Sequence, residues 1–181
     1  MRLRREKKFL LVLCLTAALL LGGCSSGSGV EKNQFEVGDK VSTCWFDFTV
    51  DQVETADFFG SYTAREGCRL AVCRLTIKNT FDQDVPMGWA DFILQWESTG
   101  EDADASAAGG VEGAYTLPQY TQDQFLDEYT LEKDGQREGL LVFEVPEEVS
   151  RAALVFQELY ADGESASQYT EGSSYYVWMD L

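Results

Sequence analysis

The chain has 181 residues, with 31 acidic side chains, 14 basic side chains, no histidine and a formal net charge of −17 at pH 7. This charge disfavours nucleic acid as a partner, because phosphates are repelled by an acidic surface. The lack of histidine excludes Ser-His-Asp and Cys-His catalysis and histidine-based zinc sites, and no phosphate-binding or dinucleotide-binding glycine motif occurs, so we predict no catalytic residue, no metal site and no cofactor.

The first element in the chain is a predicted leader. Residues 1–8 carry five basic side chains and one acidic one, and Phe9–Leu21 is an apolar run of thirteen residues. A run of this length is typical of the apolar part of a signal peptide and is too short to cross a bilayer comfortably. We therefore expect residues 1–23 to be a helical signal peptide.

The motif Leu21-Gly22-Gly23-Cys24 closes this leader and resembles the lipobox of bacterial lipoproteins. The resemblance implies that a diacylglycerol is attached to the Cys24 thiol and that cleavage makes Cys24 the first residue of the mature chain. Two acyl chains are enough to hold a protein stably on a membrane. An ordinary signal peptide with a chance cysteine, or an uncleaved anchor, is the alternative.

The mature chain then begins with a short polar stretch. Residues 24–34 are rich in serine and glycine and are predicted to be a flexible tether. Removing the leader takes away five basic side chains and one acidic one, which changes the net charge from −17 to −21. Such a surface keeps a protein soluble beside a membrane, and it also attracts cations or a basic partner.

From residue 35 onward, apolar and polar side chains alternate with a period of two, which is typical of half-buried strands. The segment 125–131 fits either a strand or a helical turn, and we favour a strand that forms a hairpin through Lys133–Gln136. The polar segments Gly100–Gly113 and Ala161–Ser174 are expected to be loops. Strands are predicted in seven segments, 40–53, 69–79, 89–96, 125–131, 139–145, 152–160 and 175–181.

Three cysteines lie in the predicted domain, at Cys44, Cys68 and Cys73. An odd number allows one disulfide and one free thiol, or no disulfide. Cys68 and Cys73 are five residues apart and would point to opposite faces of a strand, so Cys44 is the better partner in any bridge. Because Cys44 and Cys73 both fall on apolar faces, where free cysteines are common, we expect no obligatory disulfide.

The four tryptophans of the domain are candidates for an aromatic surface that binds a sugar or a partner protein, and they are Trp45, Trp89, Trp96 and Trp178. Trp45 and Trp178 fall on outward positions of the predicted strands and are the favoured pair. Packing within the sheets or under the loops is the alternative. Acidic clusters at Asp82-Gln83-Asp84 and Glu101–Asp104 could bind Ca²⁺, but neither has the EF-hand spacing, and solvated turns explain both.

Three groups of motifs carry a resemblance to a known family: Val37-Gly38-Asp39, Leu75–Thr80 followed by Asp91–Leu94, and Leu131–Gly135 followed by Gly139–Pro146. In this order they resemble a widespread domain of unknown function in secreted lipoproteins of Gram-positive bacteria, sometimes mislabelled as telomeric repeat-binding factor. The resemblance implies an immunoglobulin-like antiparallel β-sandwich of about seven to eight strands over the domain 35–181, and it supplies no catalytic residues. Asp134 departs from the family pattern, and residues 175–181 extend past it as an added edge strand.

Together these features predict a lipid-anchored protein on the outer face of the cytoplasmic membrane of a Gram-positive bacterium. We expect a binding module rather than an enzyme, with the membrane and an unidentified protein or glycan as partners. A structural or envelope-maintenance lipoprotein without a specific ligand is one alternative. An acid-pair hydrolase or enzyme accessory subunit is another, and it requires a cleft with two facing carboxylates. Trp45 and Trp178 clustered on one exposed face would favour binding.

Overall fold

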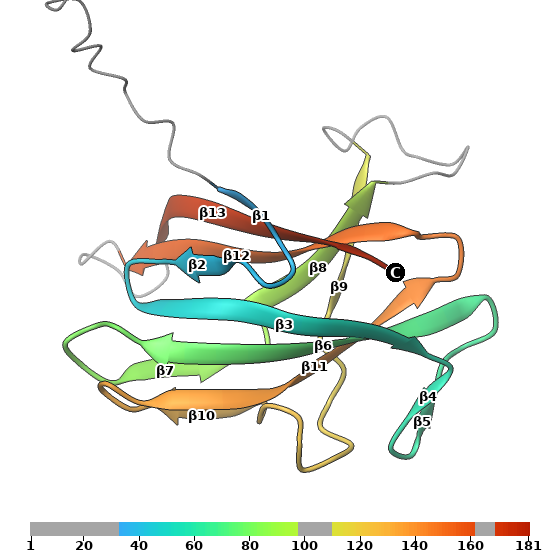
Figure 1. The fold of residues 1–181 in the computed structure, drawn as a ribbon, viewed down its shortest axis with the longest axis horizontal. Coiled ribbons are helices and arrows are strands. Elements are labelled where there is room, and N and C mark those ends of the chain that lie inside the picture. Colours follow the sequence, from blue (N-terminus) through green and yellow to red (C-terminus); the bar gives the residue numbers. More distant parts are fainter. Residues whose placement is uncertain (1–32, 98–109, 162–168) are drawn as a thin grey trace, which may run out of the picture. The chain divides into compact units, whose positions relative to one another are not determined.

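This computed structural model describes residues 33–97, 110–161 and 169–181 (Figure 1). Within these residues, all helix or strand structure is β-strand. They belong to one compact unit, Lys32–Leu181, and no helix within them has the length and apolarity to cross a bilayer. The signal peptide, the lipobox and most of the tether lie outside the described residues. In chain order the strands are β1 (Gln34–Glu36), β2 (Lys40–Ser42), β3 (Phe46–Ala56), β4 (Phe58–Phe59), β5 (Tyr62–Thr63), β6 (Cys68–Asn79), β7 (Val85–Gly88), β8 (Phe92–Glu97), β9 (Val111–Tyr115), β10 (Glu128–Leu131), β11 (Gln136–Pro146), β12 (Arg151–Ala161) and β13 (Tyr169–Asp180).

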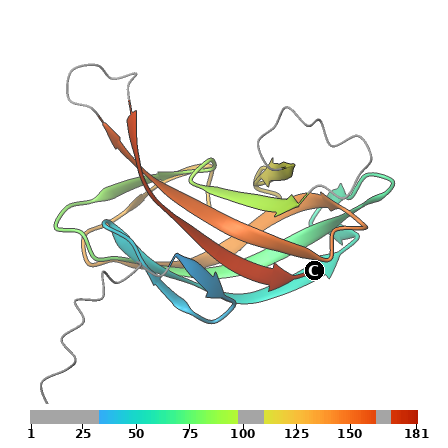
Figure 2. The same cartoon turned by 90° about the horizontal axis from the view of Figure 1, so that it is seen from above.

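The predicted all-β sandwich is confirmed. Its two layers are a five-stranded sheet in the order β1-β13-β12-β8-β9 and a four-stranded sheet in the order β11-β6-β3-β2. Two short ribbons, β10-β7 and β4-β5, accompany them. The pairs are antiparallel except that β1 runs parallel to β13. The long strands β12 and β13 lie side by side in the five-stranded sheet (Figure 2).

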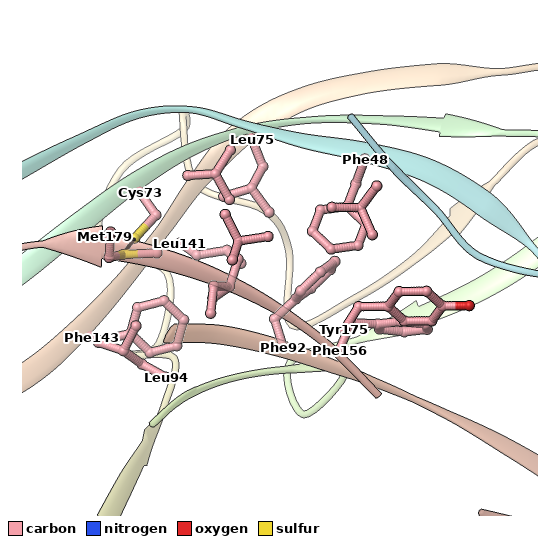
Figure 3. Packing of buried hydrophobic residues seen from close by; sticks show 14 of the residues in the cluster. Phe48, Cys73, Leu75, Phe92, Leu94, Leu141, Phe143, Phe156, Tyr175 and Met179 are labelled. Carbon is pink, nitrogen blue, oxygen red and sulfur yellow. Dashed lines mark hydrogen bonds between the residues drawn. The ribbon is translucent and has the colours of Figure 1, made fainter. Parts of the chain in front are cut away.

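The core lies between the two sheets and is built from the alternation that the sequence displays. Phe48 of β3 faces Phe92 of β8, with ring centroids 5.3 Å apart, and Phe46 faces Phe156 of β12 at 4.8 Å. Figure 3 shows the rings of Phe48, Phe92 and Phe156 gathered with side chains from both layers. Each buried aromatic side chain removes a large apolar area from water, so this cluster is the main favourable contribution to folding.

Two bulges interrupt the regular pairing. The register between β3 and β6 shifts between Val50 and Gln52, and that between β12 and β13 shifts between Gln157 and Leu159. The first leaves Asp51 of β3 out of the pairing, and in the second Gly172 and Ser173 of β13 lie opposite Glu158 of β12. A bulge redirects the side chain at that position, and bulges are frequent beside functional sites.

Three sequence expectations differ from the structure. The strand at 128–131 exists, but β10 pairs with β7 rather than forming a hairpin with β11. The Asn79 amide explains this pairing, because its Nδ2 donates to the carbonyls of Leu131, Glu132 and Gln83 and ties the two segments together. Expected loops also hold strand residues, since β9 begins at Val111 and β13 at Tyr169. Backbone pairing with β8 and β12 forms these strands where apolar alternation is absent.

The two outer faces of the sandwich differ in how they are covered. On the four-stranded sheet, the segment 117–125 follows the β11 edge, with Leu117 N donating to Val142 O at 2.7 Å and Phe125 N to Leu140 O at 3.1 Å. Leu140 and Val142 point outward from β11 and are buried. The β4–β5 hairpin is held at the same sheet by Glu144, which accepts from Tyr62 Oη and Arg65 N. On the outer side of the five-stranded sheet, Ala153 and Val155 of β12 are buried between the larger side chains of neighbouring strands, and Tyr176 and Trp178 are half-buried.

Candidate binding surface

The outer face of the five-stranded sheet presents aromatic side chains in register. Tyr176 of β13 lies opposite Val155 of β12, Val155 lies opposite Ile93 of β8, and Ile93 lies opposite Tyr115 of β9. Directly paired residues point to the same side of a sheet, and strands are about 4.8 Å apart, so this row spans about 14 Å between the two tyrosines. Trp178 lies two residues beyond Tyr176 and shares its face.

This row is extended and exposed at its β9 end. The Trp89 ring, just before β8, packs edge to face against Tyr115 with ring centroids 5.0 Å apart. Trp89 is 49% exposed and Tyr115 is 54% exposed, which is unusual for such large apolar side chains. We call the set Trp89, Ile93, Tyr115, Val155, Tyr176 and Trp178 the aromatic face. Ile93, Tyr176 and Trp178 are half-buried and Val155 is buried, so the exposed part of this face is the Trp89–Tyr115 pair. Clustered exposed apolar side chains mark an interaction site more often than isolated ones do.

A charged row borders the aromatic face. Arg151 of β12 pairs with Asp180 of β13, and its guanidinium lies 5.1 Å from the ring centroid of Trp178. Arg151 Nη2 is also 3.4 Å from Glu36 Oε1. Glu97 of β8 points to the same side, because it lies two residues beyond Gln95, the partner of Ala153. Three acids and one base therefore share this end of the face.

Trp45 and Trp178, the favoured pair from the sequence, are not brought together. Trp45 is half-buried and packs against the core, with its ring 6.2 Å from Phe156 and 5.4 Å from Tyr160. Strand parity does not apply to Trp45, since β3 begins only at Phe46 and residues 43–45 form a turn in which Thr43 Oγ1 accepts from Phe46 N. Trp178 instead lies on the outer face beside Ala153. Trp178 is thus part of the aromatic face, and Trp45 is not.

Sequence reasoning missed Tyr115 as a member of this surface, because its strand follows a polar segment that indicates a loop. Trp89, one of the four candidate tryptophans, is exposed beside Tyr115, whereas Trp96 is buried in the core. Ile93 and Tyr176 follow the alternation of their strands and face outward.

A second cluster surrounds Glu158 of β12, which lies opposite the bulge in β13. Its carboxylate is buried, at 3% exposure for the residue, and it accepts hydrogen bonds from Cys44 N at 2.8 Å, Tyr160 Oη at 2.8 Å and Tyr175 Oη at 3.0 Å. Ser173 N adds a longer contact at 3.4 Å. These donors come from the β2–β3 turn and from both strands of the β12–β13 hairpin. Glu158 therefore joins the two sheets at one end of the sandwich.

The hydrogen bonds decide the charge state of Glu158. Burial alone would raise the pKa of the carboxyl, but the donors from Cys44, Tyr160 and Tyr175 outweigh burial and hold the pKa below its ordinary value. Gly172 leaves the space that this arrangement needs, since a Cβ there would lie 2.4 Å from a Tyr160 ring carbon. A fully satisfied buried carboxylate of this kind has a structural role.

The cysteines give no metal site and no bridge among the described residues. Cys44, Cys68 and Cys73 are free thiols. Cys44 was expected on an apolar face but is exposed, because it belongs to the turn before β3. Cys73 is buried beside Met179 Sδ at 3.7 Å, and burial raises the pKa of its thiol to about 12. No three acidic or cysteine side chains of the described part lie close enough together to hold a metal ion, and Glu101–Asp104 falls outside it.

Two small hollows in the described part of the domain lack the acid pair that hydrolysis requires. One, beside Trp89 and Phe125, has room for about 10 Å³ and is lined by one acidic residue, Asp127. The other, on the outer side of the four-stranded sheet, has about 170 Å³ and is lined by one acidic residue, Glu54, together with Arg74. Both are smaller than the few hundred Å³ of an ordinary small-molecule pocket. Neither presents two facing carboxylates.

Comparisons with known proteins place the fold but not an activity. No protein-family model and no curated protein matches the chain. The fold is similar to that of ycdA of Bacillus subtilis, which carries the provisional description of a lipoprotein, with a TM-score of 0.53 and 15% identity over 78% of this chain. The match spans only 38% of the ycdA chain.

Two further solved structures share the architecture. One is an uncharacterized β-sandwich protein of Clostridium difficile 630, with a TM-score of 0.51, 15% identity, and coverage of 81% of this chain and 93% of that one. The other is the yjhA protein of Bacillus subtilis, with a TM-score of 0.50, 16% identity, and coverage of 67% and 81%. At these identities the likeness concerns the fold alone. The chain is therefore a β-sandwich that shares its architecture with proteins of unassigned function.

Proposed function

We propose that this chain is a lipid-anchored binding module on the outer face of the cytoplasmic membrane, and that the aromatic face is its binding surface. The anchor rests on Leu21-Gly22-Gly23-Cys24 and the basic, apolar leader before it. The provisional description of ycdA as a lipoprotein is compatible with this anchor. Anchoring by Cys24 leaves the domain beyond the tether free to meet a partner outside the cell.

The observation that carries the binding role is the exposure of Trp89 and Tyr115 at the end of a registered apolar row. Aromatic side chains are enriched at the energetic centres of protein interfaces, because they bury a large area while losing little rotamer freedom. A purely structural lipoprotein has no need of large apolar groups held in water. An acid-pair hydrolase needs a cleft with two carboxylates, and neither of the two hollows described above has one.

Substitution of Trp89 and Tyr115 by alanine is expected to abolish partner capture without unfolding the domain. Both side chains are about half exposed, so the loss of stability should be within about 1 kcal/mol. The measurement is affinity capture with the full chain from cells that produce it, after cross-linking at the cell surface. Phe58→Ala is the matched control, since Phe58 is 69% exposed in β4 beside the other sheet. Capture that is equally strong in both variants would contradict the proposal.

A further inference from the structure

The acids at the border of the aromatic face give it a preference in charge. Glu36, Glu97 and Asp180 lie on this face around Arg151, so the local charge is negative. The described residues as a whole contain 24 acidic and 8 basic side chains, so the surrounding surface does not reverse this sign. An acidic field of this extent attracts a positively charged partner and repels an anionic one.

Arg151 shows how this face holds a guanidinium group. Its side chain lies over Trp178, 5.1 Å from the ring centroid, while its Nη2 approaches the Glu36 carboxylate at 3.4 Å. Aromatic rings attract cations through their negative faces, and a nearby carboxylate adds a charge-assisted contact. Glu97 and Asp180 are further carboxylates in the row of Arg151, and the row that contains Trp178 separates them from the row of Tyr115 and Tyr176.

From this charge complementarity we infer that the aromatic face binds a protein segment that presents both arginine or lysine and apolar side chains on one side. The apolar side chains pack on Ile93 and the tyrosines, and the cationic groups reach Glu97 and Asp180. This inference rests on the proposed function, because it names the partner of the same surface. A neutral glycan, whose apolar ring faces also stack on aromatic side chains, is the competing occupant that the test must separate.

The test uses the full chain in detergent micelles and two synthetic octapeptides. In one, pairs of arginine residues alternate with pairs of leucine residues, so that each side of the extended peptide carries both types. In the other, citrulline, the uncharged analogue of arginine, replaces each arginine. The arginine peptide should bind about tenfold more tightly at low salt, measured by tryptophan fluorescence. This ratio should fall towards one between about 0.02 M and about 0.5 M salt, where screening becomes strong.

Matched variants locate the effect on the face. Glu97→Gln with Asp180→Asn should remove most of the discrimination between the two peptides. Asp82→Asn with Glu138→Gln makes the same change in net charge at exposed positions away from the face and should retain the discrimination. Equal binding of the two peptides, no binding of the arginine peptide, or equal effects of the two double variants would overturn the inference.

A titration with cellohexaose, a neutral sugar chain, under the same conditions separates this inference from the proposed function. Binding of cellohexaose that requires Tyr115 and Trp89, with no preference between the peptides, would overturn the cationic partner but leave the binding surface standing. If the Trp89 and Tyr115 variant loses capture but the two peptides bind equally, the cationic partner is overturned and the binding surface still stands. Undiminished capture by that variant would instead remove the proposed function itself.

Discussion

Replacing Glu158 by alanine is expected to lower the free energy of unfolding by about 3 kcal/mol, because it leaves one buried and two part-buried donors without an acceptor. The donors are Cys44 N, Tyr160 Oη and Tyr175 Oη, all within 3.0 Å of the carboxylate. Urea unfolding of the chain that begins after Cys24, followed by tryptophan fluorescence, measures the change. Glu171→Ala is the control, since it removes an exposed acid from the paired strand β13 and should change stability by less than about 0.5 kcal/mol.

The loss should depend on pH in a definite direction. The pKa of Glu158 is lower in the folded chain than its ordinary value of 4.5, so the unfolded chain binds a proton more readily. Stability that comes from the carboxylate is therefore present above pH 4.5 and is lost as the pH falls through the folded pKa. The difference between the wild type and Glu158→Ala should shrink in acid. A difference that stays constant from neutral pH into acid, or is below about 1 kcal/mol, would show that the cluster does not hold the sheets together.

Replacing Cys24 by alanine is expected to release the protein from membranes or to leave an unprocessed precursor. The thiol is the attachment point that the lipobox implies, and without it no acyl chain anchors the mature domain. Each buried methylene contributes about 0.8 kcal/mol to membrane binding, so losing two chains removes nearly all of it. Membrane fractionation and N-terminal sequencing measure the outcome.

Cys44→Ala serves as the matched control for this change. Cys44 is an exposed thiol of the folded domain, and it has no part in the predicted anchor. Its replacement should leave the protein on membranes with normal processing. Unchanged fractionation and processing of Cys24→Ala would refute the lipoprotein assignment.

Much of the sandwich could be predicted from alternation alone. Phe46, Phe48 and Val50 in β3, and Leu75 and Ile77 in β6, are buried as their spacing indicates. These positions are predictable because one face of each strand must leave water, and a register shift by one residue would expose all of them. Pairing between distant segments was harder to predict. The β10–β7 ribbon depends on the Asn79 amide, whose three carbonyl partners come from two separate loops.

The candidate surface was predictable only in part. Trp178 follows strand parity and faces outward, whereas Trp45 precedes its strand and turns towards Phe156. Tyr115 could not be assigned to this surface from the sequence. Its position follows from the pairing of β9 with β8, which depends on backbone contacts that local composition does not record. Glu158 offered one signal, an acidic residue within an otherwise apolar strand. Its three principal donors, however, come from sequence positions as far away as Cys44.

The most direct test of the binding role is photo-cross-linking in intact cells from position 115. A p-benzoylphenylalanine residue replaces Tyr115 in the full chain, and the same residue replaces Phe58 in a parallel strain. Both sites are exposed aromatic positions, at 54% and 69%, so the probe itself is equally tolerated. The proposal predicts a discrete cross-linked partner from position 115 and none from position 58. Identical products from both sites, or no product from position 115, would contradict the aromatic face as a binding surface.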